Sequence, residues 1–193
     1  MKRDGYFLYE MKRLSSIKIP SDIGEWVTIS DDSPTGLIKI KVARPQLIRQ
    51  LNQPIGSPSV RKHMTYFRFD LGKRSEKISY YNHRVIYYLH YGVDPGEMEV
   101  DFIDNDSLNL HPSNLRLVTR AQQLWNVRAR VDGNTPHKGV RVKTVEGIKY
   151  LEASVRCNKQ CFSRIFKIEE MQEAVDWATQ QRNLLHGEYA RHL

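Results

Sequence analysis

The chain has 193 residues, with 30 Lys or Arg against 22 Asp or Glu, so its net charge is +8 at pH 7. Its 40% hydrophobic and 27% charged residues are ordinary for a globular protein of one sizeable or two small domains. No apolar run approaches a membrane span, and the N-terminus lacks the apolar core of a secretory signal. We expect a cytoplasmic, intracellular protein with no membrane partner. The basic charge favours a polyanion, above all nucleic acid.

The first part of the chain predicts short strands around one helix. Residues 1–24 form a basic N-terminal arm, followed by "DDSPTGLIKI", a turn and a strand. "ARPQLIRQLNQPIGSPS" predicts a short helix or loop, and the alternation in "TYFRFDL" predicts a strand paired with "ISYYN". "HRVIYYLHYG" predicts a helix ending at Gly92. On this helix we expect His83 to make a structural hydrogen bond rather than to bind a metal with His90.

The stretch from residue 99 to 126, "EVDFIDNDSLNLHPSNLRLVTRAQQLWN", predicts a hairpin followed by a short helix. "EVDFI" and "LRLVT" are the two strands, and the loop between them is rich in turn formers. Thr119 is placed to cap the helix that begins with "RAQQLWN".

This stretch resembles the ββα-metal core of HNH endonucleases, which often reads "VDHINGD" and then "NLRLVT". The resemblance implies a hairpin and helix that hold one divalent metal against a DNA phosphate. Hydrolysis of a phosphodiester needs a base to activate water and a cation to offset charge on the phosphate. Asp101 matches the family's first metal ligand, Asn114 matches the Asn that braces the hairpin, and Asn126 matches a structural Asn.

Two positions depart from the family pattern. Phe102 stands where the general-base His belongs, and Gln123 stands where the helix supplies a second metal ligand. A phenyl ring cannot accept a proton, and losing a positioned base costs about 10²- to 10⁴-fold in rate. His111 is the candidate substitute base, and Asp104 replaces a family Asn. We therefore expect a weak or absent metal site at Asp101 and Gln123, with no cofactor if the protein is inactive and Mg or Mn if it is active.

After this core, residues 128–136 predict a polar linker, and residues 137–193 predict a second domain. "GVRVKTV", "IKYLEASVRC" and "QCFSRIFK" are three short strands with turns at "EG" and "NK". A helix is expected over 169–185, and its apolar face has the helical spacing. That face comprises Met171, Ala174, Val175, Ala178 and Leu185, and the first turn carries Glu169, Glu170 and Glu173.

This second domain, which closes with "HGEYAR", resembles the APETALA2-type DNA-binding domain often attached to HNH homing endonucleases. The resemblance implies a sheet face in the DNA major groove, which is wide enough to admit two strands. Glu152 and Leu151 replace the Arg and Trp of many relatives, which argues against base-specific contacts there, since a carboxylate that faces phosphate is repulsive. The candidate DNA-binding residues are basic side chains of the linker and the strands: Arg128, Arg130, Arg141, Lys143, Lys149, Arg156 and Arg164.

The fold class we predict is α+β: an HNH-type ββα-metal core plus a small three-stranded antiparallel sheet packed on one helix. The expected domains are the arm 1–24, an HNH-like domain 25–127 with its ββα core at about 98–127, the linker 128–136 and an APETALA2-like domain 137–193. The predicted function is double-stranded DNA binding with impaired cleavage. One alternative is an active metal-dependent HNH endonuclease or nickase. Another is a protein-interaction scaffold, although the sequence indicates no protein partner.

Overall fold

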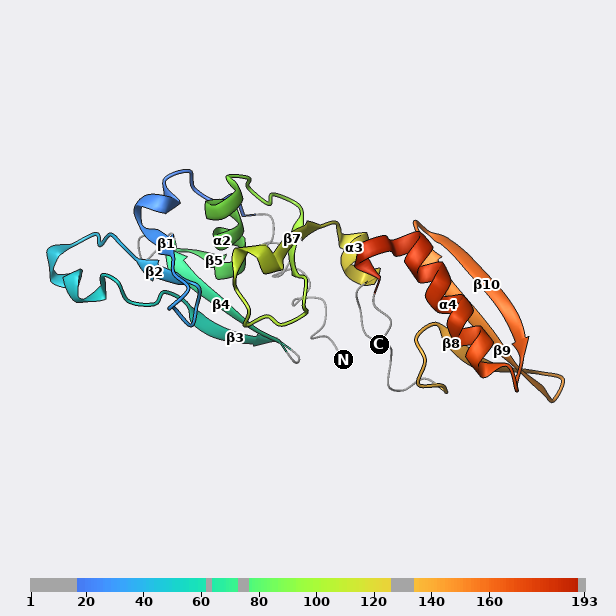
Figure 1. Ribbon diagram of the computed structural model, residues 1–193. Coiled ribbons are helices and arrows are strands. Elements are labelled where there is room, and N and C mark those ends of the chain that lie inside the picture. Colours follow the sequence, from blue (N-terminus) through green and yellow to red (C-terminus); the bar gives the residue numbers. More distant parts are fainter. Residues whose placement is uncertain (1–16, 62–63, 73–76, 126–133, 191–193) are drawn as a thin grey trace. The chain divides into compact units, whose positions relative to one another are not determined.

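A computed structural model describes residues 17–61, 64–72, 77–125 and 134–190 of the chain (Figure 1). The chain divides into two compact units, Met1–Val118 and Thr119–Leu193, which are called unit 1 and unit 2 below. Helices alternate with small antiparallel sheets, which confirms the predicted α+β class. Within the described ranges, no helix is long and apolar enough to cross a membrane.

Unit 1 is built from short hairpins that surround helix α2 (Asn82–Tyr91). Its described strands are β1 (Val27–Ile29) paired with β2 (Leu37–Lys39), β3 (Ser57–Arg61), β4 (Met64–Leu71) and β5 (Ile78–Tyr81) in one sheet, and β6 (Glu99–Phe102) paired with β7 (Leu115–Val118). Among the described residues of this unit, the connections contain three 3₁₀ helices, Ile23–Glu25, Pro45–Gln50 and Pro112–Asn114. Figure 1 shows α2 in green beside β4 and β5.

The core of unit 1 gathers the inward side chains of these elements around the first half of α2. Val85 and Ile86 of the helix are fully buried, and Ile19 and Ile23 pack in the same cluster. The last two residues belong to the predicted N-terminal arm, so residues 17–24 are part of the folded unit rather than an extension from it. Helix α2 ends at Gly92, as predicted, and the φ of +70° at this residue is the left-handed conformation that glycine adopts at helix ends.

Strand β3 was not predicted, because "SPSVR" carries a proline and no clear apolar alternation. It lies at the edge of the β3-β4-β5 sheet. An edge position tolerates Pro58, since a proline there withdraws no donor from the middle of the sheet.

Unit 2 contains α3 (Arg120–Trp125), β8 (Val140–Val145), β9 (Ile148–Cys157), β10 (Gln160–Lys167) and α4 (Met171–His186), followed by a 3₁₀ turn, Gly187–Tyr189. The strands form the predicted three-stranded antiparallel sheet, and their order is β10-β9-β8. Both hairpin turns have two successive residues with positive φ, Glu146 with Gly147 and Asn158 with Lys159, which suits tight hairpins. Helix α4 packs on one face of this sheet.

Helix α4 begins later than predicted. Glu170 has a non-helical backbone, and its carboxylate accepts a hydrogen bond from the Lys167 backbone N–H at 2.8 Å. Glu169 and Glu170 therefore precede the helix, and Glu173 alone of the three predicted acidic residues lies in its first turn. Farther along, Arg182 is buried and donates to the Lys138 carbonyl at 2.7 Å.

Candidate metal hairpin and nucleic-acid interface

The β6–β7 hairpin places Asp101 directly opposite Arg116. Val100 and Phe102 point into the core, whereas the side chains of Asp101 and Arg116 are 14% and 16% exposed. The Arg116 Nε and Nη2 atoms donate to Asp101 Oδ2 at 3.2 and 3.1 Å. A guanidinium cation thus lies against the carboxylate that matches the family's first metal ligand.

Phe102 fills a buried aromatic cluster at the end of β6. Its side chain is 3% exposed, and its ring centroid lies 5.3 Å from that of His83 and 6.2 Å from that of Tyr66. His83 also stacks on Tyr81, with centroids 5.4 Å apart. Position 102, which the resemblance aligns with the family's general base, is therefore occupied by a core residue.

His83 is held by ring contacts rather than by the structural hydrogen bond that we predicted at this residue. Its Nδ1 atom is buried without a hydrogen-bond partner. Burial, and next the neighbouring charge of Arg84, lowers the pKa of His83 to about 3. The imidazole is consequently neutral at physiological pH. His90, by contrast, is exposed near the end of the same helix, so the two histidines do not face a common site.

The loop between β6 and β7 is braced by the side chain of Asn114. Its Oδ1 atom accepts from the Asp104 backbone N–H at 3.1 Å, and its Nδ2 atom donates to Asp104 Oδ1 and to the Asn109 carbonyl, each at 2.9 Å. Burial raises the pKa of Asp104, but hydrogen bonds from Asp106, Asn109 and Asn114 outweigh it and leave this pKa below its ordinary value. One amide therefore joins both sides of the loop.

His111, the candidate substitute base, caps the 3₁₀ helix Pro112–Asn114. Its Nδ1 atom accepts from the Ser113 backbone N–H at 3.3 Å and lies 2.7 Å from Ser113 Oγ. In the neutral ring an accepting Nδ1 leaves the proton on Nε2. The lone pair that a general base would use is thus engaged in local structure.

Helix α3, which carries Gln123, belongs to unit 2, whereas Asp101 belongs to unit 1. Thr119 and Gln122 form a capping box, in which the Thr119 N–H donates to Gln122 Oε1 at 2.7 Å and the Gln122 N–H donates to Thr119 Oγ1 at 3.3 Å. The Gln123 carbonyl oxygen accepts a hydrogen bond from Arg120. Both candidate metal ligands therefore have an arginine as hydrogen-bond donor, each within its own unit.

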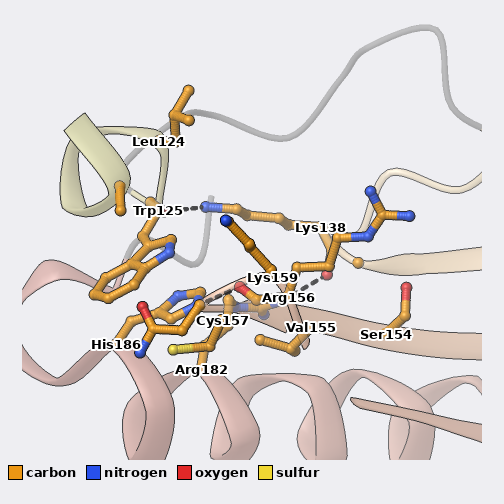
Figure 2. A pocket seen from close by; sticks show the side chains of 13 residues that line it. Leu124, Trp125, Lys138, Ser154, Val155, Arg156, Cys157, Lys159, Arg182 and His186 are labelled. Carbon is orange, nitrogen blue, oxygen red and sulfur yellow. Dashed lines mark hydrogen bonds between the residues drawn. The ribbon is translucent and has the colours of Figure 1, made fainter. Parts of the chain in front are cut away.

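Helix α3 is attached to unit 2 by a ring stack beside a cavity of about 750 Å³ (Figure 2). The Trp125 and His186 rings lie 4.6 Å apart and are nearly parallel, at 4°. Lys138 Nζ donates to the Trp125 carbonyl at 2.9 Å, and His186 Nε2 donates to the Arg156 carbonyl at 3.0 Å. These contacts explain why the unit boundary precedes α3. The predicted linker begins nine residues later, and its residues 128–133 lie outside the described ranges.

The register of the β8–β10 sheet separates the predicted DNA-binding residues into two groups. Arg141, Lys143 and Arg156 alternate with buried residues and lie on the face opposite α4, which is called the open face below. Lys149 and Arg164 have the opposite register and share the face on which α4 packs. Arg128 and Arg130, like Asn126, lie outside the described residues.

The comparisons with known proteins agree with part of this picture. A family model described as HNH endonuclease matches residues 80–124, from the end of β5 through α2 and the β6–β7 hairpin to α3. No curated protein and no solved structure matches the chain significantly. Residues 80–124 are therefore HNH-like, and this match indicates a DNA-binding or nuclease function.

Sequence reasoning missed three contributors to these sites. Arg116 was overlooked, although the hairpin register alone places it opposite Asp101. Glu152 was treated as an isolated departure, yet it bonds to a basic neighbour on the open face. The Trp125 contact with His186 joins residues 61 positions apart and leaves no local signal in the sequence.

Within the described part of the chain, no group of three or more His, Cys, Asp or Glu side chains is arranged to hold a metal.

Proposed function

We propose that this protein binds double-stranded DNA through the open face of unit 2, and that its HNH-like region is impaired in cleavage. The observation that carries the proposal is the separation of the two faces of the β8–β10 sheet. One face is closed by α4, and the other presents Arg141, Lys143 and Arg156 together. Cationic side chains gathered on one face bind phosphates, and two adjacent strands fit the major groove.

We further propose that unit 2 is an APETALA2-type module and that the whole chain is a relative of HNH homing endonucleases. The three antiparallel strands backed by one helix support this proposal. The HNH family match over residues 80–124 supports the second part. A net charge of +8 supports binding to a polyanion.

Impaired cleavage is supported by the chemistry at the two positions where a nuclease needs a base and a cation. Phe102 has no proton acceptor and is buried against His83. Asp101 Oδ2 accepts two hydrogen bonds from Arg116, and Gln123 accepts one from Arg120. A divalent cation at either ligand would compete with a bound guanidinium. These donors therefore fit Mg²⁺ or Mn²⁺ poorly, and we derive no catalytic step through a metal.

The first test measures binding and nicking in the same samples. Intact protein is mixed with supercoiled plasmid or linear duplex in Mg²⁺, Mn²⁺ or chelator. We expect binding without nicking, and an affinity that falls steeply with salt because each phosphate contact adds about 0.9 to the salt slope. A Phe102→His variant should nick faster, since an imidazole supplies the proton acceptor that a phenyl ring lacks. Metal-dependent nicking by the unmodified protein would contradict the proposed impairment.

Matched lysine variants test the proposed face. Lys143→Ala removes a cation from the open face, and Lys149→Ala removes one from the side on which α4 packs. The two substitutions change the net charge equally, so the open-face variant alone should lower the salt slope. Equal losses would mean that the net charge, rather than this face, governs binding. Salt-insensitive binding to a protein with no DNA affinity would instead favour the scaffold alternative.

A further inference from the structure

A row of three side chains crosses the open face of unit 2 at the middle of its sheet. Arg141 on β8 and Ile165 on β10 lie directly opposite Glu152 on β9, one on each side. Arg141 Nε donates to Glu152 Oε2 at 2.5 Å, and Lys143 Nζ lies 3.5 Å from the same oxygen. The Glu152 side chain is 21% exposed and that of Arg141 is 54% exposed. The Glu152 carboxylate is therefore less exposed to solvent than the Arg141 guanidinium to which it is bonded.

The geometry of this contact leaves the two terminal nitrogens of the Arg141 guanidinium available for a ligand. A guanidinium has five N–H donors, and the bond to Glu152 uses the one on Nε. In the part of the chain that the structure describes, this is the one hydrogen bond that the Arg141 side chain makes. The terminal nitrogens are the pair that forms two parallel hydrogen bonds with guanine O6 and N7 in the major groove. Ile165 places no polar group against them.

The carboxylate also reduces the conformational freedom of the arginine. An isolated surface arginine samples many rotamers and loses that freedom when it binds. A charge-assisted hydrogen bond at Nε restrains the side chain before binding, which favours a directional contact over a diffuse attraction to phosphate. The ammonium group of Lys143 lacks the planar array of donors that a guanidinium has, and it acts as a point charge. Arg141 is thus the guanidinium on this face that a neighbouring carboxylate holds in place, which suits it to recognise a base.

We propose that Glu152 is a positioning residue that orients Arg141 to read one guanine in the DNA major groove. The inference rests on the proposed DNA-binding function and adds to it a source of sequence preference. It also gives a role to the acidic residue that, from sequence alone, was expected only to repel phosphate. The hydrogen bond from Arg141 lowers the pKa of Glu152, so this carboxylate stays ionised at neutral pH.

The test uses intact protein in chelator, so that any cleavage is suppressed. Preferred duplexes are selected from a randomised pool, and each guanine is then replaced in turn by 7-deazaguanine, which lacks the N7 acceptor. Binding is measured by fluorescence anisotropy. We expect one guanine whose replacement weakens the binding of the wild type by about tenfold. Arg141→Ala should be insensitive to replacement of that guanine and should respond normally to the others.

Glu152→Gln is the decisive variant, because it keeps the shape of the side chain and removes its charge. It should reduce the sensitivity at the Arg141 guanine at least threefold, while affinity for unrelated duplexes stays the same or rises. Glu173→Gln makes the same charge change on an exposed position of α4 and is the matched control. It should leave the guanine sensitivity unchanged. Glu152→Asp should retain part of the sensitivity.

Several outcomes would overturn the inference. If Glu152→Gln keeps the full guanine sensitivity, or strengthens binding to every duplex equally, Glu152 is a repulsive charge and positions nothing. Salt-dependent binding without any guanine tied to Arg141 would reject the inference and leave the proposed DNA-binding function intact. Failure of the wild type to bind any duplex would reject both.

Discussion

The rings of Phe102 and His83 meet inside unit 1 with centroids 5.3 Å apart and planes inclined by 54°. Phe102 comes from the hairpin, and His83 comes from the first turn of α2. The contact joins two segments of the HNH-like region through its core. Its location makes Phe102 a structural residue of this core.

Replacing Phe102 by Ala should destabilise unit 1 strongly. Truncating a buried phenylalanine removes its apolar contacts and leaves a cavity, which typically costs about 3–5 kcal/mol. Urea unfolding followed at the amides of α2 and β6 would measure the change in free energy. Ile103→Ala is the control, because the next residue is exposed and such surface substitutions change stability by about 0.5 kcal/mol or less. Similar losses in both variants would contradict the packing described.

Unit 1 should lose stability as the pH falls below about 6.5. The pKa of His83 is about 3 in the folded protein, against an ordinary value of 6.5. Between these values the unfolded chain takes up a proton that the folded chain refuses, so protonation favours unfolding. Once the pH is well below 6.5, the contribution approaches about 1.4 kcal/mol for each further pH unit.

The measurement is the free energy of unfolding of unit 1 in urea at pH 7 and pH 5. His83→Phe should reduce the difference between the two values, because the residue that titrates is gone. His90→Phe changes an exposed histidine of the same helix and should leave the difference as in the wild type. A His83→Phe variant with an undiminished pH dependence would show that other groups cause it.

Asn114→Ala should loosen the loop between β6 and β7. The substitution removes three hydrogen bonds and leaves the Asp104 amide and the Asn109 carbonyl without that partner. Loss of such an interior polar contact costs about 1–3 kcal/mol. Amide hydrogen exchange over residues 104–110 should rise more than in Asn109→Ala, which loses one side-chain bond to Asp104 and one from the His111 N–H. Equal exchange in the two variants would argue against the bracing role.

Arg116→Gln should increase the affinity of the protein for Mn²⁺. The wild-type guanidinium lies on the carboxylate that a cation would need, and glutamine removes that charge. Calorimetric titration of metal into each protein would detect the gain. The double variant Asp101→Asn with Arg116→Gln should lose it, since the carboxylate is the required donor. Unchanged Mn²⁺ affinity in the single variant would mean that Arg116 does not compete with a metal.

The order of elements could be predicted from the sequence because its signals are local. Alternation predicted β4, and the turn residues at "EG" and "NK" separated the three predicted strands of unit 2. Gly92 marked the end of α2, and Thr119 marked the start of α3. The HNH resemblance rested on residues 99–126, and the family match over residues 80–124 covers all but the last two of them.

Other features depend on side chains that are far apart in the sequence. A Phe at position 102 can accept no proton in any fold, but its packing on His83 depends on how the hairpin meets α2. Likewise, basic residues can be counted along the strands, yet the pairing register places Lys149 and Arg164 on the face opposite the open face.

The sequence by itself determined the residue types available for chemistry: a carboxylate at position 101, no base at position 102 and a surplus of cations. Only the tertiary structure decided their partners: Asp101 pairs with Arg116, Glu152 pairs with Arg141, and Trp125 stacks on His186. The reason is physical. Composition and local propensity act over a few residues, whereas an ion pair or a ring stack forms only where strand register and helix packing bring distant side chains within a few ångströms.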